Sequence, residues 1–279
     1  MQILDGIKTS EAIAGSLKVP QGVKLGVILA GKDPASESYV NMKKKRCEKL
    51  GIAVEIFNFE ANADEGELIA EINQLNKDEK VTGILVQMPL PSGVNARKIV
   101  DSVDLRKDVD GLTSSNLAKL FLNGEFIVPC TPKGVLRLAD EYHIPFEGKN
   151  VCIIGYSDLV GKPLANLCLK RGARVKVCDS KTNDLKGCAI SADIIMTATG
   201  IHKLITSDMV KKGAVIFDIG ISKTGDKVVG DVDFENVKDK CSYITPVPGG
   251  VGPMTIISLI ENLILLKDVE NTTSYGKLL

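Results

Sequence analysis

Short apolar segments rich in β-branched residues alternate with longer amphipathic segments along most of this 279-residue chain. The short apolar runs, bounded by turn residues, predict buried strands, and the longer segments predict helices. The predicted strands are 24–29, 53–59, 81–87, 150–154, 174–178, 192–198 and 214–218. The predicted helices are 33–50, 64–75, 131–142, 159–170 and one that starts after Pro253, with a short helical region at 10–17. Strands that alternate with helices form parallel βαβ units, so we expect an α/β fold.

The pattern divides into two halves without a low-complexity linker between them. We place the boundary near Thr131, because Thr131-Pro132 is typical of a helix start. The expected first domain is residues 1–131, completed by a C-terminal helix, 255–279. The expected second domain, residues 132–254, is a Rossmann-type, doubly wound sheet.

The balance of charge and the apolar pattern exclude several classes of partner. Lys plus Arg and Asp plus Glu both number 35, so the basic face that nucleic acid requires is not expected. The apolar run 256–266 is too short to cross a bilayer and contains Glu261 and Asn262. The chain start carries Asp5 and Glu11 and has no long apolar region, so no secretory signal is expected.

Cysteine and histidine usage indicates a reduced, cytoplasmic protein. The seven cysteines are scattered and include no CxxC pair, which argues against a disulfide framework and a zinc cluster. The two histidines, His143 and His202, are far apart in the chain, so no metal site is predicted.

A glycine turn follows the predicted strand 150–154 and precedes a predicted helix. Gly155, Tyr156, Ser157 and Gly161 occupy this turn in the pattern G-x-S-x-x-x-G. Backbone N–H groups at a helix N-terminus bind the pyrophosphate of a dinucleotide, and glycine lets the anion approach. The pattern is weak by itself, because tight strand-to-helix turns often need glycine for geometry alone.

Two other strand ends belong to the same expected edge of the sheet. Asp179 ends the next strand, near the position where an acidic residue binds the adenosine ribose and would favour NAD. An equally weighted alternative makes Asp179 the cap of its own turn, and Ser180 and Lys181 could instead receive a phosphate. Gly200 and Ile221 also follow predicted strands, where a doubly wound sheet meets its ligand.

Three prolines and three glycines fall within the eleven residues 245–255. Such a stretch predicts a shaped loop rather than a helix or a central strand, because proline removes a donor and glycine opens unusual φ values. Pro253 and Thr255 stand where the final helix could begin. By itself the loop is better explained by a change of chain direction, because glycine and proline usually mark turns.

Four chemically useful residues occur in the first half. Tyr39 and Lys43 are four residues apart and share a helix face, while Gln87 ends a strand and Asp110 lies in an acidic turn. A tyrosine ring stacks on a planar heterocycle, and an enclosed lysine with a lowered pKa exchanges protons. Each residue also has an ordinary structural explanation, so only the joint pattern indicates a site.

That joint pattern resembles the methylenetetrahydrofolate dehydrogenase/methenyltetrahydrofolate cyclohydrolase family from end to end. The matching stretches are DPASESYVNMK (33–43), GILVQMPL (83–90), KDVDGLT (107–113), PCTPKG (129–134), VGDV (229–232) and ITPVPGGVGPMT (244–255). Any one of these could arise by chance, but all of them in order are specific.

The resemblance implies two activities and a set of site residues. Hydride passes from 5,10-methylenetetrahydrofolate to nicotinamide, and the 5,10-methenyl product is then hydrolysed to 10-formyltetrahydrofolate. The implied catalytic residues are Lys43, Gln87, Asp110 and Tyr39. The implied substrate contacts are Ser36, Tyr39, Lys43, Val86, Gln87, Met88, Asp110, Pro248, Gly249, Gly250, Gly252 and Pro253. The implied cofactor contacts are Gly155, Tyr156, Ser157, Gly161, Asp179, Ser180, Gly200, Ile221 and Thr255.

The resemblance also implies that the two domains flank a cleft and that the protein is a homodimer. NADP is the usual cofactor of the family. This chain has Tyr156 and Asp179 where many members have arginine and histidine, which lowers the positive charge near the adenosine ribose. We therefore expect NADP and keep NAD as an alternative.

Two other functions stay open. The first is a monofunctional dehydrogenase or cyclohydrolase of the same family, and the second is a non-catalytic nucleotide-binding protein. The presence of Lys43 argues against loss of the hydrolase, and the intact glycine turn argues against loss of the dehydrogenase. A non-catalytic protein would be expected to lack some of the folate residues, all of which are present.

Overall fold

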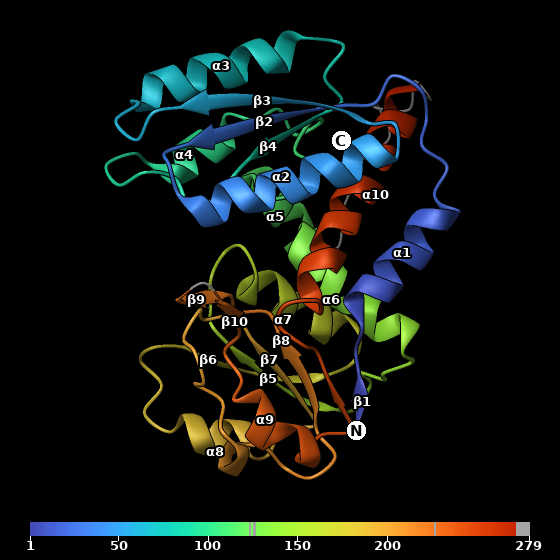
Figure 1. Ribbon diagram of the computed structural model, residues 1–279, viewed down its shortest axis with the longest axis vertical. Coiled ribbons are helices and arrows are strands. Elements are labelled where there is room, and N and C mark those ends of the chain that lie inside the picture. The colour runs from blue at the N-terminus through green and yellow to red at the C-terminus, as the bar shows by residue number, and fades with distance from the viewer. Residues whose placement is uncertain (123, 125–126, 226, 272–279) are drawn as a thin grey trace. The chain divides into compact units, whose positions relative to one another are not determined.

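The computed structural model describes residues 1–122, 124, 127–225 and 227–271. The chain forms two compact units, which Figure 1 colours along the sequence. The six-stranded unit comprises Met1–Gly15 and Thr131–Ile257, and the three-stranded unit comprises Ser16–Cys130 and Ser258–Leu279. Each unit is built around its own parallel sheet, which confirms the predicted α/β class.

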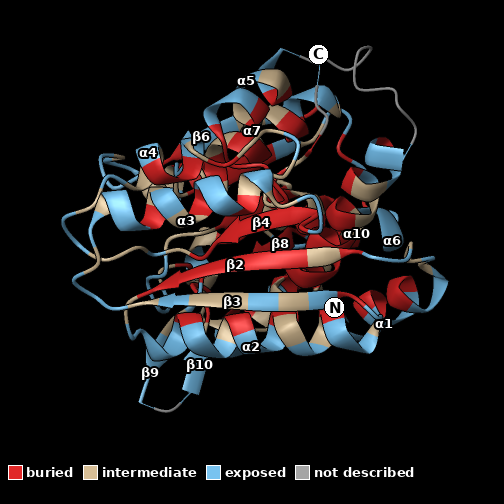
Figure 2. Ribbon diagram, turned by 90° about the horizontal axis from the view of Figure 1, so that it is seen from above, coloured by how far each residue is buried: buried red, intermediate tan, exposed pale blue. Residues whose placement is uncertain are grey.

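The sheet of the three-stranded unit has the order β3-β2-β4 and is parallel throughout. Its strands are β2 (Lys24–Ala30), β3 (Ala53–Phe59) and β4 (Gly83–Val86). The connecting helices, α2 (Pro34–Lys49) and α3 (Glu65–Lys77), cover opposite faces of this sheet (Figure 1). The central β2 and its neighbour β4 are largely buried, whereas the edge strand β3 is partly exposed (Figure 2). The continuous apolar run of β2 follows from this cover on both faces.

Capping side chains determine where several helices of this unit begin. The carboxylate of Asp33 accepts from the backbone N–H of Ser36 at 2.8 Å, and Pro34 occupies the first turn of α2. Asp64 and Glu67 form a reciprocal capping box at the start of α3. The unit also contains α4 (Ala96–Asp101) and α5 (Ser114–Phe121).

The sheet of the six-stranded unit has the order β1-β11-β8-β7-β5-β6, again with parallel pairs throughout. Its strands are β1 (Gln2–Ile3), β5 (Asn150–Ile154), β6 (Arg174–Cys178), β7 (Ile194–Thr197), β8 (Val215–Asp218) and β11 (Tyr243–Ile244). The chain leaves β5 towards β6 and then returns to β7 on the other side of β5. This reversal is a topological switch point, where doubly wound sheets bind their ligands.

Helices and one hairpin complete the six-stranded unit. The helices are α1 (Gly6–Ser16), α6 (Cys130–Glu141), α7 (Gly161–Lys170), α8 (Leu185–Ala189), α9 (Phe234–Val237) and the first turns of α10 (Val251–Asn271), with 3₁₀ turns η1 (Ser207–Met209) and η2 (Lys238–Lys240). The hairpin pairs β9 (Ser222–Thr224) with β10 (Lys227–Val229).

The chain start differs from the expected domain division. Residues 1–15 lie in the six-stranded unit rather than with 16–130, because β1 pairs with β11 and Gly6 packs against Gly250. A Cβ added at Gly6 would lie 1.7 Å from the carbonyl oxygen of Gly250, so only glycine permits this contact. The helix there spans Gly6–Ser16 instead of the expected 10–17.

The last helix also differs from expectation. α10 begins at Val251, inside the segment 245–255 and ahead of the start that we expected at Pro253 or Thr255. Pro253 is tolerated there because the first N–H groups of a helix have no intrahelical acceptor to lose. The expected end of this helix, 272–279, lies outside the described residues.

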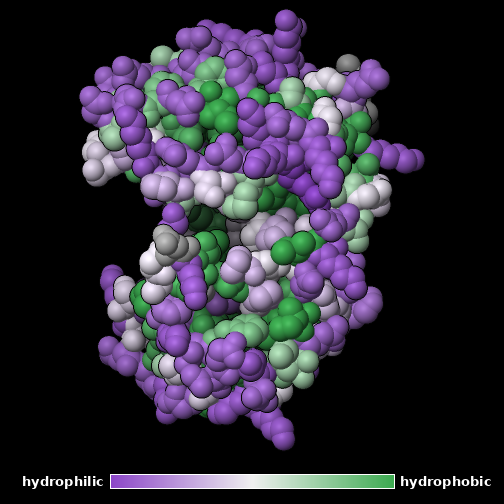
Figure 3. Space-filling model, in the orientation of Figure 1, coloured by the Kyte–Doolittle hydropathy of each residue, from purple (hydrophilic) through white to green (hydrophobic). Residues whose placement is uncertain are grey.

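Buried apolar side chains fill the space around each sheet, and hydrophilic side chains dominate the face seen in Figure 3. One core cluster of the six-stranded unit includes Cys152, Cys178 and Cys188. All seven cysteines are buried, because a free cysteine packs as a small apolar residue. Within the described ranges, no helix is long and apolar enough to cross a membrane.

Candidate functional site

Lys43 is a buried lysine on the inner face of α2, with a relative exposure of only 5%. Its Nζ donates a hydrogen bond to Oε1 of Gln87 at 2.9 Å, and it lies 4.6 Å from the centre of the Tyr39 ring. Tyr39 reaches Lys43 because four residues complete one turn of the helix. Gln87 reaches it from the end of β4, the strand that pairs with the central β2. The structure therefore brings Tyr39 and Gln87 into contact with Lys43. The fourth predicted catalytic residue, Asp110, lies near enough to act on the charge of Lys43.

Burial lowers the pKa of Lys43 below the usual range of a lysine. The lost hydration of the ammonium group is the largest cause, and Asp110, Cys130 and Cys47 oppose it through their negative charge when ionised. Burial also raises the pKa of the neighbouring Cys47 thiol to about 12, so this cysteine stays protonated at neutral pH. A lysine with a lowered pKa exchanges protons more readily near neutral pH, as general acid–base catalysis requires.

Gln87 is held in place on its other side as well. Its Nε2 donates to the carbonyl oxygen of Met88 at 2.6 Å, and its backbone N–H donates to Ile28 at 2.9 Å. With Nε2 engaged in this way, Oε1 is the atom that faces the ammonium group of Lys43. The amide thus accepts from Lys43 without adding a charge that would raise the pKa of the lysine.

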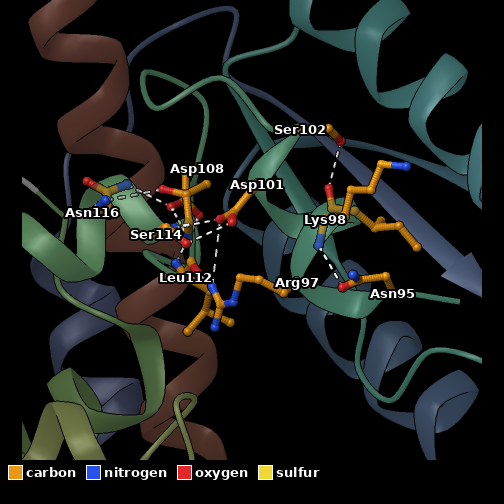
Figure 4. A network of polar contacts seen from close by, with 11 residues as sticks. Asn95, Arg97, Lys98, Asp101, Ser102, Asp108, Leu112, Ser114 and Asn116 are labelled. Carbon is orange, nitrogen blue, oxygen red and sulfur yellow. Dashed lines mark hydrogen bonds and ion pairs between the residues drawn. The ribbon is translucent and has the colours of Figure 1, made fainter.

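Asp110 lies half-buried in a turn that a second, buried aspartate, Asp108, organises. Figure 4 shows Asp108 beside Leu112 and Asn116. Asp108 is 3% exposed and accepts from the backbone N–H groups of Leu112 and Thr113 at 3.2 and 2.9 Å. It also accepts from Nδ2 of Asn116 at 2.7 Å. Burial raises the pKa of Asp108, and these hydrogen bonds act in the opposite direction.

A buried asparagine from α10 supports the same turn. Nδ2 of Asn262 donates to the carbonyl oxygens of Val109 and Val128, both at 3.0 Å. Gly111 follows with a φ of +70°, and an added Cβ would lie 2.9 Å from the backbone nitrogen of Pro129. The turn that carries Asp110 is therefore fixed by backbone conformation and by two buried polar side chains.

The remaining predicted substrate residues of this unit have different placements. Ser36 is buried, and its hydroxyl donates to Oδ2 of Asp33 at 2.7 Å, so it takes part in the cap of α2. Val86 is buried at the end of β4, and Met88 is half-buried two residues later. Both therefore flank Gln87 along the chain.

The glycine turn of the six-stranded unit leads from β5 into α7. Gly155 has a φ of +104°, and an added Cβ would lie 2.5 Å from the carbonyl oxygen of Ala198, which follows β7. An added Cβ at Gly161 would lie 1.9 Å from the carbonyl oxygen of Gly155. These two glycines close the turn at the switch point between β5 and β7, beside the N-terminus of α7. This backbone fits a dinucleotide pyrophosphate.

The side chains of this turn face solvent or their own neighbours. Tyr156 is 51% exposed, and Nζ of Lys162 lies 5.2 Å from the centre of its ring. Lys162 also forms an ion pair with Asp158. The hydroxyl of Ser157 accepts from the N–H of Val160 at 3.2 Å. The N-terminus of α7, with its partial positive charge, and the ammonium group of Lys162 thus both lie close to the turn.

Asp179 follows β6, which pairs with β5, the strand that precedes Gly155. Its carboxylate accepts from the backbone N–H of Lys181 at 2.9 Å, so it caps its own turn as the alternative explanation held. Asp179 and Ser180 are both exposed. The capping role leaves the carboxylate of Asp179 exposed to solvent.

Three other predicted cofactor residues lie elsewhere in the six-stranded unit. Gly200, with a φ of +72°, comes three residues after β7, and Ile221 is 54% exposed three residues after β8. Thr255 is buried in α10, where its hydroxyl bonds to Thr131 and Val251 at 3.2 and 3.3 Å. Gly200 and Ile221 therefore follow carboxyl ends of adjacent strands, while Thr255 ties two helices together.

The segment 245–250 shapes the approach to α10. Gly249 has a φ of +107°, and an added Cβ at Gly250 would lie 2.6 Å from the carbonyl oxygen of Pro246. The N–H of Gly250 donates to that same oxygen at 2.9 Å. Pro248 is exposed, and Gly252 and Pro253 are half-buried in the first turn of α10. All of these predicted substrate residues lie in the six-stranded unit.

Sequence reasoning missed several buried polar residues that organise the sites. They are Asp108, Asn116 and Asn262 in the three-stranded unit and Thr197, Asp218 and Asp231 in the six-stranded unit. The paired aspartates in KDVDG (107–111) and GDVD (230–233) were the sequence signal that could have revealed Asp108 and Asp231. Within the described residues, no group of His, Cys, Asp and Glu could hold a metal ion.

Two family models together match most of the chain. The catalytic domain of the tetrahydrofolate dehydrogenase/cyclohydrolase family matches residues 2–110, and its NAD(P)-binding domain matches residues 129–271. The chain is 48% identical over 254 residues to the bifunctional protein FolD of Methanosarcina barkeri, which covers 91% of this chain and 88% of that protein.

Solved structures give the same result. The bifunctional FolD enzyme of Campylobacter jejuni superposes with a TM-score of 0.88 at 45% identity, over 96% of this chain and 99% of that chain. The FolD enzyme of Trypanosoma brucei, in complex with NADP and an inhibitor, superposes with a TM-score of 0.91 at 29% identity, over 97% of this chain and 98% of that chain. With both halves matched and the buried lysine, glutamine and glycine turn in place, this chain belongs to the tetrahydrofolate dehydrogenase/cyclohydrolase family.

Proposed function

We propose that this chain oxidises 5,10-methylenetetrahydrofolate with NADP and then hydrolyses the 5,10-methenyl product to 10-formyltetrahydrofolate. The observation that carries this proposal is the buried hydrogen bond between Lys43 and Gln87 in a chain whose two halves both match the family. Relatives named as bifunctional FolD proteins cover nearly the whole chain, which supports both activities together.

The chemistry of the hydrolytic step centres on Nζ of Lys43. Water that adds to the methenyl carbon must lose a proton, and ring opening must deliver a proton to the departing nitrogen. An amine with a lowered pKa performs such transfers near neutral pH. Gln87 holds Nζ in one direction, and the ring of Tyr39 beside it offers a flat surface for the folate.

The other predicted substrate residues belong to the same proposal. Asp110, in the turn organised by Asp108, accepts hydrogen bonds from the polar edge of the pterin. Ser36 supports the start of α2, and Val86 and Met88 border Gln87. Residues Pro248, Gly249, Gly250, Gly252 and Pro253 of the six-stranded unit are proposed to contact the folate as well.

The proposed cofactor residues are the backbone of Gly155 to Ser157 and the N-terminus of α7 for the pyrophosphate. Gly200, Ile221 and Thr255 are proposed as further contacts. When bound, NADP supplies the nicotinamide that accepts the hydride. NAD stays an alternative, because Tyr156 and Asp179 place no positive charge beside the adenosine ribose. We also propose that the protein is a homodimer in the cytoplasm, on the basis of the family resemblance.

A turnover assay tests the function directly. Purified protein is given 5,10-methylenetetrahydrofolate with NADP and, in parallel, with NAD, while reduced cofactor, methenyl compound and 10-formyl product are followed separately. We expect all three signals, with faster reduction of NADP than of NAD. Hydrolysis of added methenyltetrahydrofolate without reduction of either cofactor would identify a monofunctional cyclohydrolase. Reduction without hydrolysis would identify a dehydrogenase.

A further inference from the structure

Asp231 is a fully buried carboxylate at the carboxyl edge of the six-stranded sheet, with 0% exposure. Its Oδ2 accepts three hydrogen bonds, all from the end of β7 and the residues after it. The donors are the hydroxyl of Thr197 at 2.7 Å, the backbone N–H of Thr199 at 2.7 Å and the hydroxyl of Thr199 at 2.9 Å. One oxygen atom thus fixes the backbone immediately before Gly200.

The other oxygen of Asp231 lies against the end of β8. A Cβ added at Gly220 would be 2.0 Å from Oδ1, so the carboxylate occupies the space that any other side chain there would need. Among the residues that the structure describes, none donates a hydrogen bond to Oδ1. This oxygen is therefore in contact with the backbone immediately before Ile221.

A second buried carboxylate holds Asp231 in position. Asp218, at the end of β8, accepts from the backbone N–H groups of Asp231 and Val232 at 2.9 and 3.0 Å. A Cβ added at Gly230 would lie 2.0 Å from Oδ2 of Asp218, so glycine is required on this side as well. The N–H of Asp218 in turn donates to the hydroxyl of Thr245 at 2.7 Å.

A pair of carboxylates this deeply buried is costly, and a smaller neutral side chain would pack the same space with less loss of hydration. What the pair provides is a rigid connection between two strand ends. The two loops that it connects, 198–200 and 219–221, follow the carboxyl ends of β7 and β8. Doubly wound sheets bind their cofactor at the carboxyl ends of their strands. Neither carboxylate is exposed enough to touch the cofactor itself.

We propose that Asp231 is a positioning residue for the nicotinamide cofactor, which sets the separation of the loops at Gly200 and Ile221. The inference rests on the proposed dehydrogenase function. Through its hydrogen bonds to Thr197 and Thr199 and its contact with Gly220, the carboxylate fixes both loops before cofactor arrives. Cofactor binding then avoids the entropic cost of ordering the two loops, which is the general advantage of a preformed site.

The test compares Asp231→Ala with Asp231→Asn and with Asp239→Ala, which removes an exposed carboxylate from the same unit. The readouts are the Kd for NADP, measured by calorimetry without folate, and the rate of methenyltetrahydrofolate hydrolysis without cofactor. Asp231→Ala is expected to raise the Kd at least tenfold. Asp231→Asn keeps a carbonyl oxygen for the three donors and is expected to stay within about threefold, since most of the geometry survives.

The hydrolysis rate separates positioning from a loss of folding, because Lys43 and Gln87 belong to the other unit. We expect this rate and the circular dichroism spectrum to be unchanged in all three variants. If Asp231→Ala does not fold, Thr197→Val takes its place, because it removes the hydroxyl donor to Oδ2 with little change in the size of the side chain. A severalfold rise in Kd is then expected.

Two results would overturn the inference, and they are distinguishable. An unchanged Kd in the folded Asp231→Ala or Thr197→Val variant, with normal binding by the wild type, removes Asp231 from cofactor positioning and leaves the proposed function intact. Failure of the wild-type protein to bind either NADP or NAD overturns the proposed dehydrogenase, and this inference with it.

Discussion

Nζ of Lys43 donates a 2.9 Å hydrogen bond to Oε1 of Gln87, although 44 residues separate the two in the chain. Both side chains are at least nine-tenths buried, so the ammonium group has exchanged water for one neutral amide and one aromatic ring. A neutral partner satisfies a donor without restoring the charge stabilisation that water provided. Burial therefore keeps the pKa of Lys43 low, while the pairing with Gln87 holds its nitrogen in one place without adding a charge.

Lys43→Met should abolish the hydrolysis of methenyltetrahydrofolate and leave measurable hydride transfer. Removal of a general acid–base group costs roughly 10²–10⁴-fold in rate, whereas hydride transfer depends more on positioning than on proton movement. Methionine fills most of the buried space of the lysine stem. The two activities are assayed separately, with Lys45→Met as the matched control, because Lys45 is an exposed lysine on the same helix. Normal hydrolysis by Lys43→Met would remove this lysine from the mechanism.

Gln87→Glu should shift the pH dependence of hydrolysis to higher pH. A carboxylate beside Nζ favours the charged ammonium form, so the pKa of Lys43 rises and the limb of the profile that it controls moves upwards. The rate constant is measured across pH for this variant, for the wild type and for Gln74→Glu, which adds the same charge at an exposed position of α3. Identical profiles for all three proteins would show that ionisation of Lys43 does not control the rate.

Asp179→Asn should improve the affinity for NADP relative to NAD. Asparagine keeps an oxygen for the N–H of Lys181, so the turn is preserved and only the negative charge near the ribose is lost. The dissociation constants for both cofactors are measured by titration. Asp184→Asn is the control, because Asp184 is likewise a capping aspartate, bonded to the N–H of Gly187 in α8. An unchanged NADP/NAD ratio would show that Asp179 does not face the ribose.

Asp218 should make the protein less stable as the pH rises from about 4 to about 7. Burial, followed by the nearby charge of Asp231, raises the pKa of Asp218 to about 7 from an ordinary value of 3.8. The folded state then binds more protons than the unfolded state in this window, so the free energy of unfolding falls as pH increases. The stabilisation of the folded state by protonated Asp218, relative to the ionised form, is complete below about pH 4 and is lost as the pH rises through about 7. It amounts to at most about 4 kcal/mol.

Urea unfolding at several pH values tests this dependence. Asp218→Asn mimics the protonated carboxyl group and should show a shallower decline between pH 5 and pH 8 than the wild type. The difference between the two proteins is used because other groups also titrate. Parallel curves for the wild type and the variant would mean that Asp218 is already ionised in the folded state.

Local patterns determined much of this protein. Apolar patterning located β2, β3, β5 and β6 to within about a residue. The covered strands β2 and β5 show continuous apolar runs, and the edge strands β3 and β6 mix apolar with polar residues because they are partly exposed. The spacing of Tyr39 and Lys43 placed both on one helix face, since four residues make about one turn. The turn from Gly155 to Gly161 also followed from sequence, because a tight strand-to-helix turn requires residues without Cβ.

Contacts between distant segments were decided only by the tertiary structure. β1 joins β11 across some 240 residues and carries the chain start into the six-stranded unit, which no local pattern encodes. The start of α10 at Val251 was likewise not encoded locally. The first N–H groups of a helix have no intrahelical acceptor, so where a helix can begin depends on how its first turn is packed. The partners of Asp108, Asn262 and Asp231 likewise come from other elements. A local sequence pattern shows whether a segment is a helix or a strand, because each has its own period of apolar residues. The pKa of Lys43 and the roles of the buried carboxylates depend on desolvation and on hydrogen bonds, which exist only after the elements have packed together.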